Sequence, residues 1–155
     1  MITFFQSIPF IVKLVIGINL LITGYMWVGQ PVVINAPFPE FINDVAGFST
    51  GFLIAMNSNS VQQNTKEYEI TLKHEYVHYI QQAYITPLGF SLYVMYHLSK
   101  NFIKYGFKPY FFLYYTDNYF ENQAYELMYS ENIKIPEYIN VNLNLNWRNY
   151  YENTY

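Results

Sequence analysis

The longest apolar stretch of this chain, FIVKLVIGINLLITGYMWV at residues 10–28, carries a single charge, on Lys13. Its length is about the minimum at which a helix spans a hydrocarbon core. We therefore expect residues 1–29 to form an apolar helix that spans or lies on a membrane. Two glycines and the central Asn19 leave a buried helix of the domain as the alternative. A secretory signal peptide fits less well, because residues 1–9 contain no Lys or Arg.

The composition narrows the class of protein further. Only 12% of the 155 residues are charged, roughly half the usual fraction, which excludes a solvated linker or disordered tail. The length favours one domain. With 8 Lys and Arg against 11 Asp and Glu, and no run of like charges, nucleic acid is not an expected partner. The absence of Cys excludes disulfides, thiolate metal sites and cysteine nucleophiles.

The remaining pattern predicts a single α+β, predominantly helical domain over residues 30–138, followed by a C-terminal strand or tail at 139–155. Pro and Gly recur in the segment that follows the apolar stretch, and they lie at the ends of two short β-prone runs. Three helices are expected next, with an irregular aromatic segment before the last of them. The expected elements are strands in PVVIN and in Gly51–Met56, helices from Lys66 to Thr86, from Leu88 to Tyr105 and from Asp117 or Asn118 to about Ile133, the irregular segment Phe107–Thr116, and a strand from Ile139 to Trp147.

The first of these helices contains the spacing H-E-x-x-H, formed by His74, Glu75 and His78. Helix residues four apart lie on one face, so the two imidazoles can converge on one ion. Glu75 points about 100° around the axis and can take a proton from a metal-bound water, whose pKa zinc lowers from about 16 toward 7. The motif therefore indicates a Zn²⁺ site, and the alternative is two surface histidines on an amphipathic helix.

A catalytic zinc needs a third protein ligand, and the metzincin position is ruled out because residue 84 is Tyr84. We expect the ligand to be Glu121, early in the last helix, because the small Ala124 on the same face allows close helix packing. Glu126 is the second choice for this ligand. Otherwise it belongs to a solvated face or orients one of the metal ligands by a hydrogen bond. Gln81 is either an ordinary surface amide or a hydrogen-bonding partner of a loop carbonyl or of the Glu121 backbone.

HEYVHYIQQ, the following Pro87-Leu88-Gly89 and the later YFENQAYE resemble the gluzincin clan of zinc metallopeptidases, above all the compact bacterial minigluzincins. The similarity covers about residues 68–128. It implies a minimal zincin-like core in which a small sheet accompanies the H-E-x-x-H helix and the Glu-bearing helix. It also implies zinc ligands His74, His78 and Glu121, with Glu75 as the catalytic base.

The same resemblance suggests that Gly51–Met56 is the edge strand beside the cleft, where a peptide or protein substrate pairs. The chain departs from the family pattern at Tyr119, where related sequences often have Pro. No residue stands out as the group that stabilises the oxyanion. Tyr125 and His97 are the candidates, although His97 is more simply read as a partly buried helix residue.

The expected function is zinc-dependent hydrolysis of a peptide bond, with Glu75 as general base. The alternative is a membrane-associated structural or interaction protein with a structural or degenerate metal site. We expect the protein to be membrane-associated if the apolar helix inserts, and cytoplasmic otherwise.

Overall fold

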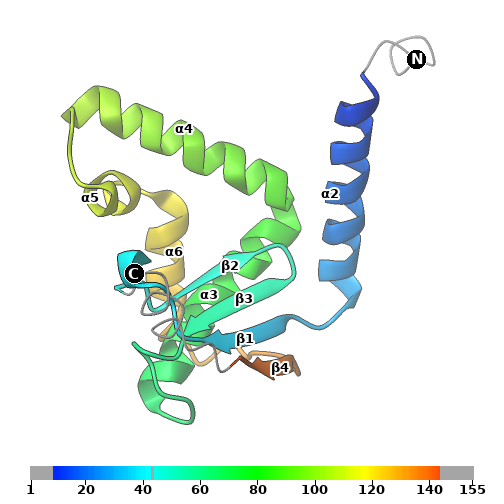
Figure 1. Ribbon diagram of the computed structural model, residues 1–155, viewed down its shortest axis with the longest axis vertical. Helices are drawn as coiled ribbons and strands as arrows, with labels where there is room; N and C mark the ends of the chain where they lie inside the picture. Colours follow the sequence, from blue (N-terminus) through cyan, green and yellow to red (C-terminus); the bar gives the residue numbers. More distant parts are fainter. Residues whose placement is uncertain (1–8, 43, 144–155) are drawn as a thin grey trace, which may run out of the picture.

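The computed structural model describes residues 9–42 and 44–143 and has an α+β fold, as the sequence predicts (Figure 1). Helices surround one face of a small sheet, and the N-terminal helix stands beside them. In chain order the elements are α2 (Phe10–Val28), β1 (Val32–Ala36), the 3-10 turn η1 (Glu40–Ile42), β2 (Gly47–Thr50), β3 (Leu53–Asn57), α3 (Lys66–Ile85), α4 (Pro87–Tyr105), α5 (Tyr110–Tyr115), α6 (Tyr119–Leu127) and β4 (Ile139–Asn142).

The four strands form one sheet in the order β2-β3-β1-β4. Strand β1 is parallel to β3 and β4, whereas β2 and β3 form an antiparallel hairpin. The prediction that Gly51–Met56 is the edge strand is therefore wrong: β3 lies inside the sheet, and β2 is the edge strand. The hairpin turns at Gly51, whose φ of +54° is a conformation that glycine adopts readily. Beyond Asn142, the rest of the strand predicted up to Trp147 lies almost wholly outside the described residues.

The core lies between the sheet and α3. Val33, Ile54 and Met56 point from the sheet and are fully buried, and they meet Leu72 and Tyr79 from α3. Burial of side chains of this size supplies most of the hydrophobic stabilisation of a small domain. One face of α3 therefore packs against the sheet and forms part of the core.

The bounds of α3 follow from its capping residues. It begins after Thr65, whose hydroxyl accepts a hydrogen bond from the backbone N–H of Tyr68. The expected start at Lys66 is therefore correct, and Asn64, which precedes the cap, has a positive φ. At the other end Thr86 separates α3 from α4 and caps α4 by accepting a hydrogen bond from Gly89. Pro87 suits the first turn of α4, because that position needs no N–H donor.

Two expectations about the C-terminal half are wrong. The aromatic segment predicted to be irregular contains the helix α5, which Asn101 holds by donating hydrogen bonds to the carbonyls of Leu113 and Thr116. Helix α6 ends at Leu127, six residues before the expected Ile133. The chain must leave the helix there because it returns to place β4 beside β1.

Helix α2 coincides with the apolar stretch at residues 10–28 and is mostly exposed, so it is not a buried core helix. Residues 1–8, which the expected helix also included, lie outside the described residues. Its second half is attached to the domain: Met26 is buried and accepts a hydrogen bond from Tyr79, and Asn19 accepts one from the backbone of Leu88. Its length and composition allow it to cross a membrane, and a signal sequence near the N-terminus has the same properties.

Candidate metal centre

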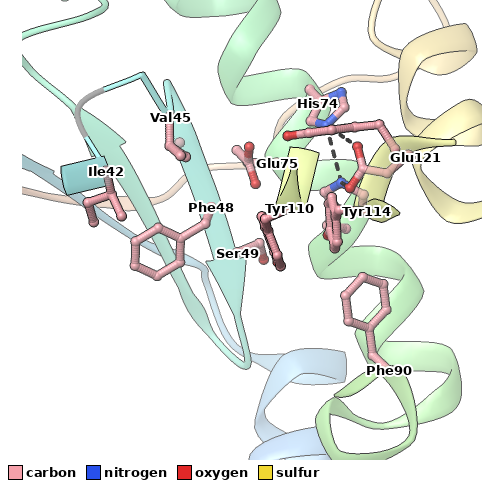
Figure 2. Close-up of a pocket in the computed structure, with 13 residues that line it drawn as sticks. Ile42, Val45, Phe48, Ser49, His74, Glu75, Phe90, Tyr110, Tyr114 and Glu121 are labelled. Carbon is pink, nitrogen blue, oxygen red and sulfur yellow. Dashed lines mark hydrogen bonds and ion pairs between the residues drawn. The ribbon is translucent and has the colours of Figure 1, made fainter. Parts of the chain in front are cut away.

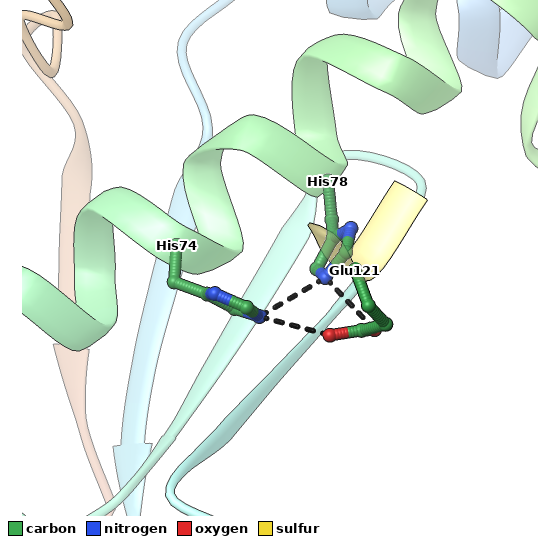
Figure 3. A group of neighbouring side chains, drawn as sticks. All are labelled: His74, His78 and Glu121. Carbon is green, nitrogen blue, oxygen red and sulfur yellow. Dashed lines mark hydrogen bonds and ion pairs between the residues drawn. The ribbon is translucent and has the colours of Figure 1, made fainter. Parts of the chain in front are cut away.

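Helices α3 and α6 bring three metal-binding side chains together (Figure 3). His74 and His78 lie one turn apart on α3, with their Nε2 atoms 3.2 Å from each other. Glu121 of α6 places one carboxylate oxygen 3.3 Å from His74 Nε2 and the other 3.2 Å from His78 Nε2. All three residues have little solvent exposure. The two histidines of the motif and the distant carboxylate therefore form one cluster.

The spacing of these atoms suits a metal ion. Ligand atoms about 2.0–2.1 Å from a tetrahedral zinc are about 3.3–3.4 Å from one another, close to the separations in this cluster. Glu121 Oε2 is also buried with no hydrogen-bond donor among the described residues. Buried lone pairs that face one point are unfavourable unless a cation or a proton lies between them. The group can hold a metal ion on both grounds.

Gln81 fixes the orientation of His78 and joins the two helices. Its carbonyl oxygen lies 2.8 Å from His78 Nδ1, and because that oxygen can only accept, Nδ1 carries the proton. The neutral ring then presents an unprotonated Nε2 to the cluster, as a metal ligand must. The Gln81 amide also donates to the backbone carbonyl of Phe120 and to the Gln123 side chain on α6. Of the two interpretations left open by the sequence, the linking role is the one observed.

Asn118 positions Glu121 at the start of α6. The Asn118 side chain accepts hydrogen bonds from the backbone N–H groups of Phe120 and Glu121, which makes it the N-cap that the sequence predicts. Ala124 is fully buried, and its small side chain allows α6 to lie close to α3. The carboxylate thereby faces the histidines rather than solvent.

The electrostatics of the cluster favour an ionised Glu121. Burial raises the pKa of this carboxyl, but the close approach of the His74 and His78 rings to its two oxygens, and their charge, outweigh burial and lower the pKa to about 2. Burial lowers the pKa of His78, whereas its hydrogen bond to Glu121 and the charges of Glu75 and Glu121 raise it above its ordinary value. The arrangement therefore stabilises the ionised form of Glu121 and the protonated form of His78.

Glu75 is buried beside this group, between strand β2 and the histidines (Figure 2). Burial raises the pKa of its carboxyl, and the charges of His78 and His74 oppose that rise. Gly47 of β2 lies so close that an added Cβ would meet Glu75 Cγ and the carbonyl oxygen of Ala55, both at 3.0 Å. Gly47 was not among the residues singled out by the sequence, although it permits this close approach.

A cavity of about 390 Å³ opens onto the cluster and onto Glu75 (Figure 2). One wall comes from Ile42, Val45 and the first three residues of β2, and the opposite wall comes from Phe90 of α4 and from α5. The residues of α5 that line it are Tyr110, Tyr114 and Tyr115. Burial and the nearby Glu121 charge raise the pKa of Tyr114 and Tyr115, so both hydroxyls stay protonated and can donate hydrogen bonds. The aromatic content of this segment was the only sequence signal for these tyrosines.

The other predicted residues lie at the margin of the site or away from it. The Tyr125 ring packs 4.7 Å from the His74 ring, centroid to centroid, but Tyr125 is half exposed and does not line the cavity. Glu126 is exposed, in keeping with a solvated face. His97 is buried, accepts a hydrogen bond from Asn101 and stacks on Tyr93, so it has a structural role in α4.

Comparison of the chain with protein-family models, with curated proteins and with solved structures found no match.

Proposed function

We propose that this chain is a zinc-dependent peptidase of the gluzincin type, with His74, His78 and Glu121 as the zinc ligands. The observation that carries the proposal is the mutual separation of 3.2–3.3 Å among their three ligand atoms. Two imidazoles and a carboxylate, with no thiolate, are a ligand set typical of catalytic zinc. Such an ion supplies Lewis acidity, which lowers the pKa of a bound water and polarises a carbonyl group.

Glu75 is the general base of the proposed reaction. Its carboxylate takes a proton from the attacking water and returns it to the leaving amine. Burial raises the pKa of Glu75, which makes its carboxylate a stronger base than an exposed one. Once protonated, the same group can act as the acid.

The residues around the cavity would bind the substrate. Strand β2 is an edge of the sheet beside Glu75, so an extended peptide can pair with it by strand addition. The Tyr114 hydroxyl is the best-placed donor to a developing oxyanion, because it is buried, protonated and adjacent to Glu121. Tyr114 replaces Tyr125 and His97 in this role.

The test is the variant Glu75→Gln, assayed with a casein-like substrate. We expect the wild-type protein to bind about one zinc and to cleave in a chelator-sensitive manner. The variant should keep the metal and lose about 10²–10⁴ in kcat, the usual contribution of a general base. Glu126→Gln is the matched control, since that carboxylate is exposed and should be dispensable. Undiminished cleavage by Glu75→Gln would contradict the assigned role.

A second function is favoured by the low exposure of the cluster, whose three side chains are 3–12% exposed and join α3 to α6. In this alternative the chain is a membrane-associated structural or interaction protein and the metal cross-links two helices. The fold would then require the metal, whereas a catalytic zinc leaves the fold intact when it is removed. In both cases α2 is the proposed membrane anchor.

A further inference from the structure

In helix α4 the polar and apolar faces are exchanged relative to an ordinary surface helix. Its inward face buries polar side chains, His97 and Asn101, which bond to each other and to α5. Its outward face is apolar and exposed: Met95 is 65% exposed and Ile103 is 84% exposed. A surface helix in water normally turns its apolar stripe toward the core. The exposed apolar residues of the stripe are Leu88, Leu92, Met95, Tyr96, Phe102 and Ile103.

These residues form one continuous surface. At about 100° per residue their side chains fall within about one third of the helix circumference, and only Ser99 interrupts them. Phe107, just beyond the end of the helix, is 93% exposed and continues the surface. In Figure 1 the sheet and α6 lie on one side of α4, and the other side of this helix carries no other element of the part of the chain that the structure describes. The stripe residues are all exposed. An exposed apolar surface of this extent on a protein indicates a binding surface.

The charges and the neighbouring helix identify the partner. Residues 87–116 contain three exposed lysines, near the C-terminal end of α4, and no Asp or Glu. Lys104 forms an ion pair with Asp117, so the positive charge offered to a partner comes mainly from Lys100 and Lys108. At its other end α4 is attached to α2 through the hydrogen bond from Leu88 to Asn19. The apolar surface of α4 thus begins beside the most apolar helix of the chain and ends next to exposed lysines. Apolar side chains bordered by lysines are typical of a segment that lies on an anionic membrane.

We propose that the outer face of α4 docks on the bilayer that α2 enters, with anionic lipid headgroups at Lys100 and Lys108. This inference rests on the proposed membrane association of α2 and is independent of the zinc chemistry. Phe90 lines the cavity from the same helix that carries the docking face. Phe90 points about 180° away from the docking face, so docking would hold the cavity about one helix diameter, ~10 Å, from the membrane surface. The substrates of the proposed peptidase would then be membrane-proximal protein segments.

The absence of Cys allows a direct test on the full-length chain. Single cysteines at Met95→Cys and Ile103→Cys carry an environment-sensitive fluorophore, and the protein is reconstituted in vesicles of phosphatidylcholine and phosphatidylglycerol that contain spin-labelled lipid. We expect lipid quenching at both positions. Tyr129→Cys is the matched control: residue 129 is 68% exposed and follows the end of α6. A label there should remain quenched only by aqueous iodide.

A label at Leu14→Cys on α2 separates the two membrane proposals. Quenching of that label by lipid, with none at Met95 and Ile103, would retain the anchor and overturn the docking of α4. Absence of quenching at all three positions would overturn both. Labels on α4 that are protected from iodide but not quenched by lipid would show that a second copy of the chain covers this face, which would also overturn the proposal.

The headgroup contact has its own test. The double variant Lys100→Gln/Lys108→Gln should weaken partitioning into phosphatidylglycerol-containing vesicles by about fivefold for each lysine removed. Partitioning into pure phosphatidylcholine should be unchanged. Lys66→Gln, a variant at the start of α3, is the control for a general loss of positive charge. Equal partitioning of the wild type and the double variant into anionic vesicles would overturn the role of the lysines.

Discussion

At the residue scale the candidate site depends on the proposed metal ligands and equally on the neighbouring residues that orient them. Gln81 and Gln82 are adjacent, buried amides with different tasks. Gln81 bonds to His78 and to α6, whereas Gln82 accepts from the Gly51 backbone and donates to Ser49 on the sheet side. The pair therefore allows metal positioning to be separated from general packing.

We expect Gln81→Leu to lower metal affinity by about 10–100-fold, because loss of a partner of a ligating histidine has this size of effect. Gln82→Leu should leave the affinity nearly unchanged while it lowers the free energy of unfolding by about 1–3 kcal/mol, the cost of unpaired buried polar groups. Titration with a chromophoric chelator and urea denaturation measure the two quantities. Equal metal affinities in the two variants would contradict the positioning role of Gln81.

The raised pKa of His78 predicts how metal affinity changes with pH. A metal must displace the proton of His78, so affinity should fall by at least about tenfold per pH unit below the pKa of this ring. The fall should begin above pH 6.5, because Glu121 and Glu75 raise the pKa from that ordinary value. Glu121, with a pKa of about 2, stays ionised and adds nothing to the slope. Competition titrations between pH 5 and 8 measure how the affinity changes with pH, and an affinity independent of pH would contradict the prediction.

The sequence predicts site residues only where the spacing is local. His74 and His78 follow from one helical turn, and Ala124 identifies the face of α6 that carries Glu121. Tyr114 could not be found in this way, because its place in the cavity depends on how Asn101 of α4 holds α5. Gly47 was missed for a similar reason, since its contact with Glu75 joins two elements that are distant in sequence.

At the element scale, Asn118 is where three helices meet. Besides capping α6 it donates to the Tyr114 carbonyl at the end of α5 and lies within hydrogen-bonding distance of the Tyr93 hydroxyl of α4. The sequence predicts α2, α3 and α4 well because each is long, with clear stops. It does not predict α5, because a run of six apolar and aromatic residues has no periodicity to indicate a helix.

We expect Asn118→Ala to lower the free energy of unfolding by about 1–2 kcal/mol through loss of the cap, and to weaken metal binding by letting Glu121 move. Asn118→Asp should recover the cap, since a carboxylate also accepts from the two N–H groups, but not the bond to Tyr114. Denaturation and metal titration of both variants test whether Asn118→Asp is more stable and binds metal more tightly than Asn118→Ala. Wild-type metal affinity in Asn118→Ala would show that the cap does not position Glu121.

At the scale of the whole molecule, the two faces of α3 have separate roles. Leu72 and Tyr79 belong to the core against the sheet, whereas His74 and His78 face α6 and the cavity. The core is thus complete without the metal centre. This division is also why the sequence predicted the α+β class correctly while it misplaced the edge strand: the class follows from the long helices, but strand order depends on pairing between distant segments.

The separation of core and site leads to a prediction about metal removal. Chelation should leave the far-ultraviolet circular dichroism at 25 °C unchanged, because the apolar cluster around Ile54 and Met56 does not include the ligands. The melting temperature should still fall, since a ligand at 100–1,000 times its Kd contributes about 3–4 kcal/mol, which corresponds to roughly 10 °C in a chain of this size. His74→Ala should behave like the chelated protein and should not respond to added zinc. Cooperative unfolding on chelation at 25 °C would instead favour the cross-linking role over the catalytic one, because only a structural metal is required for the fold.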